Sequence, residues 1–239
     1  MKAIILAGGR GTRLKPYTTS LPKPLMPIGD RPVLELVLLQ LKKYGFTDIT
    51  LAVSHLTELI QAFFGNGFKW GLDLKYSIED KPLNTVGPLK IMTELPGRFL
   101  VMNGDILTDL DLRRVWRSHE DSGDLLTVAV TPRDVKTNYG VIEFDSANRV
   151  TDFHEKPFYS HHVSMGIYIM DKGILEHIPP DMPFGFDDLV MSLLAKQIPI
   201  NVFPYDGFWL DIGRPEDYDL ANNELLSRIN EIVGNAVAI

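Results

Sequence analysis

A short apolar run that ends in a glycine-rich loop constrains the fold of this chain more than any other feature. Ala3–Ala7 is apolar throughout and leads directly into Gly8-Gly9-Arg10-Gly11. A continuous apolar run of this length, bounded by turn residues, is typical of a strand buried on both faces of a parallel sheet. Parallel strands need crossover connections, so the run predicts an α/β fold in which strands and helices alternate.

The first half of the chain has that alternation. Apolar residues at i, i+3, i+4 and i+7 predict an amphipathic helix over Pro32–Tyr44, and Leu56 to Phe64 give a second helix that closes at Gly65. We expect further strands over Ile49–Val53, Leu74–Ile78 and Phe99–Met102. These elements form βαβ units with right-handed crossovers.

After about residue 125 the pattern changes to strands joined by short turns. We expect these strands over Leu125–Thr131, Val141–Phe144, Val150–Phe153 and Val163–Met170, which makes this part mixed or antiparallel. The chain then predicts a helix over Asp187–Gln197, a strand over Asn201–Tyr205 and a helix from Pro215 to about Val233. We interpret residues 1–239 as one domain with two lobes, 1–124 and 125–239.

Composition excludes several classes of protein. The chain has 239 residues, of which 45% are hydrophobic, and a net charge of −7, a balance that argues against disorder. With no cysteine it can have neither disulfides nor a thiol nucleophile. Its acidic balance argues against nucleic-acid partners, and no apolar run is long enough for a signal peptide or a membrane span. We therefore expect a cytoplasmic protein with no membrane partner.

The glycine loop predicts an anion site. Successive glycines let backbone N–H groups converge on a phosphate. The loop lacks the third glycine of a dinucleotide fingerprint and the Gly-Lys-Ser/Thr of a P-loop. Instead it ends in Arg13, and Lys23 follows between two prolines that stiffen its backbone. Arg10 and Lys15 add to this local cluster of positive charge.

These residues resemble the motifs of the sugar-1-phosphate nucleotidylyltransferases. The loop from Leu6 to Leu14 and the Pro-Lys-Pro at Lys23 match that family, and five further motifs follow in the family's order over nearly the whole chain: Asn103-Gly104-Asp105, Tyr139-Gly140-Val141, Glu155-Lys156-Pro157, Gly166-Ile167-Tyr168 and Trp209-Leu210-Asp211-Ile212-Gly213. The resemblance implies a Rossmann-like, doubly wound mixed sheet, mostly parallel, with a smaller antiparallel sugar-binding lobe. It also implies a compact form without a C-terminal β-helix.

The resemblance implies transfer of a nucleotidyl group from a nucleoside triphosphate to a sugar 1-phosphate, with release of pyrophosphate. Arg13 and Lys23 would be catalytic, because both reactants are polyanions and catalysis depends on positioning and charge neutralisation. Residues 1–124 would mainly bind the nucleotide, and 125–239 the sugar phosphate. The expected nucleotide-binding residues are Leu6, Ala7, Gly8, Gly9, Gly11, Thr12, Glu79, Asn84, Thr85, Gly87, Asn103 and Gly104.

The resemblance also implies a metal and a sugar site. Asp105 and Asp211 would hold Mg²⁺, whose preferred ligands are carboxylate oxygens and water. The sugar phosphate would be bound by Tyr139, Gly140, Glu155, Lys156 and Gly166. Asp109 and Asp111 follow Asp105 closely, but we interpret them as the start of a helix, where acidic residues complement the helix dipole.

The nucleotide base is less strongly specified. Glu79 could accept two hydrogen bonds from guanine, which favours GTP, while dTTP, UTP and CTP stay open. Asn84 stands where many relatives have glycine, and Val86 where they have alanine, so we expect a bulkier pocket wall. Two other functions also stay open, a glycosyltransferase that binds a nucleotide sugar and a non-catalytic regulatory subunit. Homo-oligomerisation is likewise left open.

Overall fold

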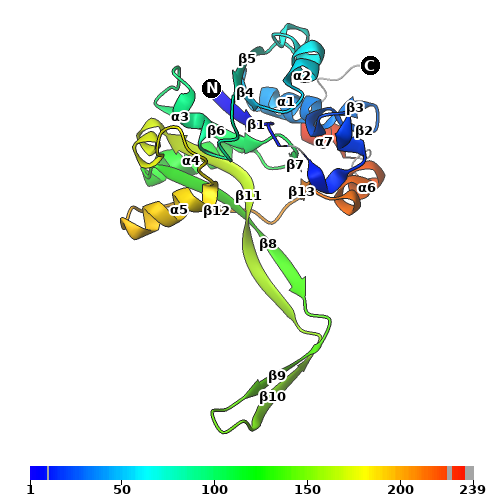
Figure 1. Cartoon of the computed structure of the whole chain (residues 1–239), viewed down its shortest axis with the longest axis vertical. Coiled ribbons are helices and arrows are strands. Elements are labelled where there is room, and N and C mark those ends of the chain that lie inside the picture. Colours follow the sequence, from blue (N-terminus) through cyan, green and yellow to red (C-terminus); the bar gives the residue numbers. More distant parts are fainter. Residues whose placement is uncertain (10, 225–227, 235–239) are drawn as a thin grey trace.

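The computed structural model describes residues 1–9, 11–224 and 228–234 (Figure 1). Arg10 of the predicted basic cluster lies outside these residues. A seven-stranded sheet in the order β12-β8-β11-β6-β1-β4-β5 forms the centre of the molecule. Its strands are β1 (Lys2–Leu6), β4 (Asp48–Val53), β5 (Asp73–Ile78), β6 (Arg98–Asn103), β8 (Leu126–Lys136), β11 (Phe158–Asp171) and β12 (Asn201–Pro204).

The sheet is mixed and mostly parallel, as the sequence predicts. β1 pairs in parallel with β4 and β6, β4 with β5, and β8 with β12, whereas β11 runs antiparallel to both β6 and β8. Three short two-stranded pairs complete the strands: β2 (Pro27–Ile28) with β3 (Arg31–Pro32), β7 (Ile106–Thr108) with β13 (Trp209–Asp211), and β9 (Gly140–Phe144) with β10 (Val150–Glu155).

Helices cover both faces of the sheet. The helices are α1 (Val33–Lys43), α2 (Thr57–Phe64), α3 (Pro88–Ile91), α4 (Leu112–Ser122), α5 (Phe186–Ala195), α6 (Pro215–Glu224) and α7 (Ile229–Val233). Alternate side chains of each strand enter different cores, because successive residues of a strand point to opposite faces. Ala3 and Ile5 of β1 pack with α1, α2 and α4, while Ile4 packs with α3 and α5. The doubly wound α/β architecture predicted from the sequence is confirmed.

The second half differs from the expectation in the lengths of two strands. The sequence predicts strands that end at Thr131 and begin at Val163, but β8 continues to Lys136 and β11 begins at Phe158. The additional residues form a two-stranded ribbon that leaves the body of the molecule, and the β9–β10 hairpin lies at its tip (Figure 1). We call residues 132–164, which comprise the ribbon and the hairpin, the arm.

The two outer strands of the sheet carry a paired lysine and a terminal proline. Lys75 on the outer strand β5 lies within 4 Å of three carboxylates, and the other outer strand, β12, has four residues and ends in Pro204. The predicted helix over 215–233 contains α6 and α7, and its residues 225–227 lie outside the described ones. No helix within the described residues has the length and apolar character needed to cross a membrane.

Candidate active site

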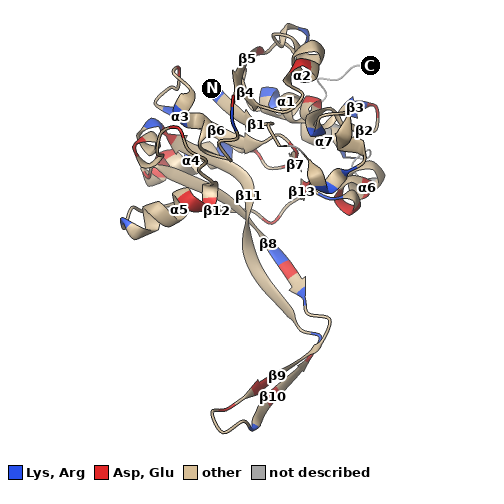
Figure 2. Cartoon of the chain, viewed as in Figure 1, with Lys and Arg blue, Asp and Glu red and all other residues tan. Residues whose placement is uncertain are grey.

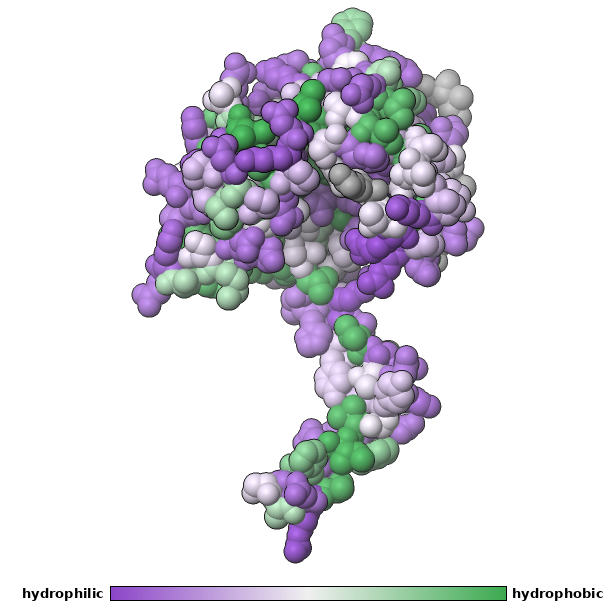
Figure 3. All heavy atoms as spheres, in the orientation of Figure 1, coloured by the Kyte–Doolittle hydropathy of each residue, from purple (hydrophilic) through white to green (hydrophobic). Residues whose placement is uncertain are grey.

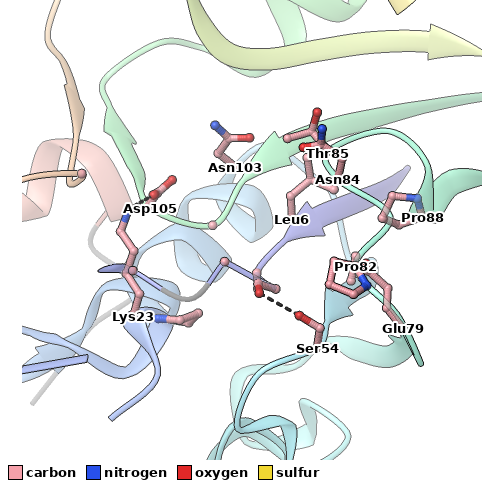
Figure 4. A pocket seen from close by; sticks show the side chains of 18 of the residues that line it. Leu6, Lys23, Ser54, Glu79, Pro82, Asn84, Thr85, Pro88, Asn103 and Asp105 are labelled. Carbon is pink, nitrogen blue, oxygen red and sulfur yellow. Dashed lines mark hydrogen bonds and ion pairs between the residues drawn. The ribbon is translucent and has the colours of Figure 1, made fainter. Parts of the chain in front are cut away.

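A cavity of about 410 Å³ opens at the carboxyl ends of β1, β4 and β6 (Figure 4). Parallel strands end at the same edge of a sheet, and open α/β sheets bind their ligands there. Fourteen of the predicted site residues line this cavity: Leu6, Ala7, Gly8, Gly9, Gly11, Thr12, Arg13, Lys23, Glu79, Asn84, Thr85, Asn103, Gly104 and Asp105. The volume falls within the usual range for small-molecule sites.

The glycine loop forms one wall of the cavity. Gly11 has φ +59°, a left-handed conformation that favours glycine, and a Cβ there would lie 2.8 Å from Thr18 Cγ2. The Thr18 hydroxyl donates a hydrogen bond to Gly11 O (2.7 Å), and Leu14 N donates to the same oxygen (2.9 Å). Gly9 and the Arg13 side chain remain exposed at the cavity, so the loop can present backbone N–H groups and a guanidinium to an anion.

Lys23 is held rigidly on the other side of this wall. Lys23 stands between Pro22 and Pro24 and begins a short 3-10 helix, Lys23–Leu25. Met26 N donates a hydrogen bond to Lys23 O (3.0 Å). Its ammonium forms an ion pair with Asp105, and the two side chains are only 12% and 20% exposed (Figure 4). The ammonium therefore lies at the cavity floor rather than in bulk solvent.

The β7–β13 pair brings Asp211 beside Asp105. Asp211 is the register partner of Ile106, and Ile212 N donates to Asp105 O (3.1 Å). Burial, and then the charge of Asp105, raise the pKa of Asp211 above its ordinary value, although Lys23 and Arg13 oppose this. Two repelling carboxylates are a donor set that fits Mg²⁺, which commonly binds one or two carboxylates together with substrate phosphates. Within the described residues no three His, Cys, Asp or Glu side chains gather to hold a metal.

Glu79 lies at the opposite end of the cavity from Lys23 (Figure 4). It follows the carboxyl end of β5, and its Oε2 accepts a hydrogen bond from Leu83 N (2.9 Å). Burial raises the pKa of Glu79, and the hydrogen bond from Leu83 partly offsets that effect. A carboxylate so fixed can accept hydrogen bonds from a ligand in the cavity.

The segment after Glu79 differs from the expected bulky wall. Asn84 has φ +66°, and asparagine tolerates this left-handed conformation better than most residues. Val86 is fully buried in the core beside Leu89, so the expectation that it narrows the pocket is wrong. Gly87 does not line the cavity either: a Cβ there would lie 2.2 Å from Leu83 O, which gives this glycine a packing role.

Six residues that sequence reasoning missed also line the cavity: Pro24, Ala52, Ser54, Pro82, Pro88 and Gly213. Ser54 follows the end of β4, and its hydroxyl donates to Gly8 O (2.8 Å). Ser54 could have been identified from the sequence, because it directly follows a predicted parallel strand, where such sheets bind their ligands. Gly213 lets the backbone lie close to the side chains of Arg13 and Asp211. A Cβ at this position would lie 3.4 Å from an Arg13 nitrogen and 3.3 Å from Asp211 Oδ1.

The predicted sugar-phosphate residues do not gather at the cavity. Tyr139, Gly140, Glu155 and Lys156 lie on the arm, at the junction of the ribbon and the hairpin, and none of them lines the cavity. Gly166 lies at the root of the arm with φ +71°, where a Cβ would lie 2.6 Å from Asn103 Nδ2. It thus packs closely against Asn103, which lines the cavity. Asp109 and Asp111 do not line the cavity, and Asp111 is the N-cap of α4, as expected.

Several named proteins are similar in sequence to this chain. A uridylyltransferase from Synechocystis sp. PCC 6803, named UTP–glucose-1-phosphate uridylyltransferase, is 35% identical over 95% of this chain and 64% of its own length. A mannose-1-phosphate guanyltransferase from Aspergillus oryzae is 34% identical over 91% of this chain and 62% of its own length. The chain therefore spans less than two thirds of these relatives.

Two solved structures and one family profile are also similar to this chain. A Bacillus anthracis protein to which glucose-1-phosphate thymidylyltransferase activity has been attributed aligns with a TM-score of 0.76 and 26% identity over 95% of both chains. HddC from Yersinia pseudotuberculosis, in complex with GMP-PN, aligns with a TM-score of 0.73 and 28% identity over 94% of this chain and 99% of its own. The sequence profile described as nucleotidyl transferase matches residues 2–228. The chain belongs to the nucleotidyl transferase family.

Proposed function

We propose that this protein transfers a nucleotidyl group from a nucleoside triphosphate to a sugar 1-phosphate and releases pyrophosphate. The observation that carries the proposal is a single cavity lined by a glycine loop, Arg13, Lys23 and Asp105. Asp211 does not line this cavity, but it lies close enough to Asp105, Lys23 and Arg13 for their charges to act on it. Phosphate-binding donors beside carboxylates suit a triphosphate and its counter-ion. The names of the relatives support the same reaction class.

In this proposal the chain acts by positioning and charge neutralisation. An oxygen of the sugar phosphate attacks the α-phosphorus, a new P–O bond forms, and the bond to the β-phosphate oxygen breaks as pyrophosphate leaves. The loop N–H groups and Arg13 bind the β- and γ-phosphates and stabilise the charge on the leaving group. Lys23, aimed by its two prolines, stabilises the charge that is redistributed at the α-phosphate.

Asp105 and Asp211 would hold a Mg²⁺ ion, which supplies further neutralisation of the triphosphate when bound. The residues fit this role because Asp211 is partly buried beside the like charge of Asp105, and a divalent cation would relieve their repulsion. Lys23 already pairs with Asp105, so its ammonium lies within reach of any phosphate oxygen bound at these carboxylates. We assign residues 1–124 mainly to the nucleotide and 125–239 mainly to the sugar phosphate.

We further propose GTP as the nucleotide. Glu79 can accept from both N1–H and N2–H₂ of guanine, whereas uracil and thymine offer one such donor, N3–H. The structural similarity to a protein in complex with GMP-PN and the sequence similarity to guanyltransferases support guanine. The relative named a uridylyltransferase supports UTP instead, so the base is the finer part of the proposal.

The test is pyrophosphate release with Mg²⁺ over a matrix of five nucleoside triphosphates and a panel of sugar 1-phosphates. We expect release with GTP and at least one sugar phosphate, and none when either substrate is omitted. Release with dTTP, UTP or CTP but not GTP would refute the base and keep the reaction class. No release with any pair would refute the reaction class and favour a regulatory subunit, while transfer from a finished nucleotide sugar would favour a glycosyltransferase.

A further inference from the structure

Among the described residues, the arm has almost no contact with the body of its own chain. No residue from 132 to 164 is buried, although the parts of β8 and β11 from which the arm extends, 126–131 and 165–170, are buried. β8 and β11 continue away from the sheet in seven consecutive register pairs. The first pair is Val130 with Ser164 and the last is Lys136 with Phe158. At about 3.3 Å per residue the ribbon places the hairpin roughly 20 Å beyond its root.

The hairpin at the tip has one apolar face without a partner. Ile142 pairs with Phe153 and Phe144 with Val150, so these four side chains lie on one face, and they are 54–67% exposed. The other face carries His154, whose Nε2 lies 3.3 Å from Asp152 and 3.6 Å from Glu143. Figure 3 shows the apolar surface along the arm, and Figure 2 shows charges of both signs on it. A two-stranded hairpin is marginally stable alone, so this face indicates a docking partner.

The exposed area is sufficient for a dimer. Five aromatic side chains of the arm are 43–78% exposed: Tyr139, Phe144, Phe153, Phe158 and Tyr159. At roughly 200 Å² per ring they offer on the order of 600 Å², and two arms offer about 1,200 Å². That area is at the lower bound of stable protein–protein interfaces. On the body, Tyr17 and Ile78 are 61% and 51% exposed beside the segments that carry Lys23 and Glu79, and they provide apolar surface for such contact.

Within the described residues, the cavity in contrast offers no cation for a second phosphate. Its described lining comes from residues 6–105 and Gly213, and its only positive side chains are Arg13 and Lys23, which our proposed function assigns to the triphosphate. The arm carries a suitable group in Lys156, which has φ +46° and lies 3.4 Å from Glu155. A left-handed conformation at a non-glycine residue is strained, and such strain clusters at functional sites.

We propose that two copies of this chain exchange arms, so that Tyr139, Glu155 and Lys156 of each copy complete the sugar-phosphate side of the other copy's cavity. The inference rests on the proposed function. To reach the cavity of its own chain, the arm would have to fold back and lose the contacts at its root. There Trp209 Nε1 donates a hydrogen bond to Met165 O (2.9 Å), and Gly166 packs against Asn103. Exchange between copies keeps this root intact and covers the apolar face.

Complementation between two variants tests the exchange. Lys23→Ala disables the cavity, and Lys156→Ala disables the arm. We coexpress two differently tagged chains, purify the heterodimer and measure pyrophosphate release. In the heterodimer of the two single variants, one site combines an intact cavity with an intact arm, so we expect about half of the wild-type rate. The matched control pairs wild type with a chain carrying both substitutions, and there arm exchange leaves both sites incomplete and the rate near zero.

The opposite pattern would overturn the proposal: an inactive heterodimer of single variants together with a half-active control means that each arm serves its own cavity. A monomer by light scattering whose activity does not change on dilution would overturn it as well. Cross-linking tests the exchange independently of the proposed function. The chain has no native cysteine, so introduced cysteines are its only thiols. With Asn138→Cys in one chain and Asp80→Cys in the other, a bis-maleimide should link two chains even if no substrate pair reacts, and its failure to do so while the wild type is active would contradict the exchange.

Discussion

At the scale of single residues, Lys23 is the group whose removal should affect turnover most. Its ammonium faces the cavity at the ion pair with Asp105, and no other lysine of the described residues lines the cavity. We expect Lys23→Ala to lower the rate of pyrophosphate release by about 10²–10³-fold, as loss of one preorganised charge stabiliser commonly does. Circular dichroism and thermal unfolding should show a folded protein.

The matched control for this prediction is Lys69→Ala, which removes an exposed lysine outside the cavity. It should leave turnover within about twofold of wild type, since exposed surface charges contribute little. A Lys23→Ala enzyme that turns over as fast as the Lys69→Ala enzyme would refute the role given to Lys23.

Glu79 determines base preference in our proposal, and its amide variant tests this. Glu79→Gln keeps the shape but replaces one acceptor oxygen with a donor, which leaves a guanine N–H without an acceptor. We expect kcat/KM for GTP to fall about 10–100-fold, the loss of one hydrogen bond to a charged group, and the ratio of UTP or dTTP use to GTP use to rise. Steady-state kinetics with each triphosphate measure both quantities. Asp80→Asn, next in sequence but outside the cavity lining, should change neither.

At the scale of elements, Asp111 illustrates how local structure explains an acidic residue near the site. Its side chain accepts from Arg113 N (3.0 Å) and caps α4, and the Arg113 hydrogen bond helps to lower the pKa of Asp111 against the effect of burial. We expect Asp111→Ala to lower the free energy of unfolding by about 1 kcal/mol, measured by urea denaturation, with the cavity chemistry unchanged. Asp121→Ala, in the last turn of α4, should be neutral or slightly stabilising because an acidic group there opposes the dipole. Equal effects of the two substitutions would contradict the capping role.

The elements also show what the sequence could predict and why. β1, α1 and β4 were predicted nearly to their ends, because their apolar periodicity reports burial in a core. The ribbon residues, such as Arg133, Asp134 and Lys136, face no core in their own chain, so their pattern carries no such signal. Residues 6–23 were predicted as a phosphate-binding segment from the glycine loop after a strand and from their resemblance to family motifs, which are local signals. The position of Lys156 relative to the cavity depends instead on the course of the arm, which no local pattern reports.

At the scale of the whole molecule, stability should depend on pH through a buried histidine. His119 is fully buried, its Nδ1 lies 2.8 Å from Thr127 Oγ1, and Arg98 and Asp171 lie nearby. Burial lowers the pKa of His119 below its ordinary value of 6.5, although the hydrogen bond and charge of Asp171 oppose this. The unfolded chain therefore binds one more proton than the folded chain between the folded pKa and 6.5.

The stability contributed by neutral His119 is thus complete above pH 6.5 and is lost as the pH falls below it. We expect the free energy of unfolding, from urea titrations between pH 8 and pH 5, to fall by at most about 1.4 kcal/mol per pH unit from this group. His119→Gln should flatten the curve in that range. An unchanged slope in the variant would assign the acid sensitivity to other groups, of which Asp171, with a lowered pKa, loses its contribution at more acidic pH.

The two outer strands of the central sheet also decide how copies of this chain can grow into larger assemblies. Lys75 places a charge on the edge of β5, and β12 is short and ends in Pro204, which has no N–H to donate. The charge on β5 and the short, proline-ended β12 both hinder pairing with the sheet of another copy. Fibril formation by edge-to-edge stacking is therefore disfavoured, and a closed pair through the arms can form without competition from open-ended polymers.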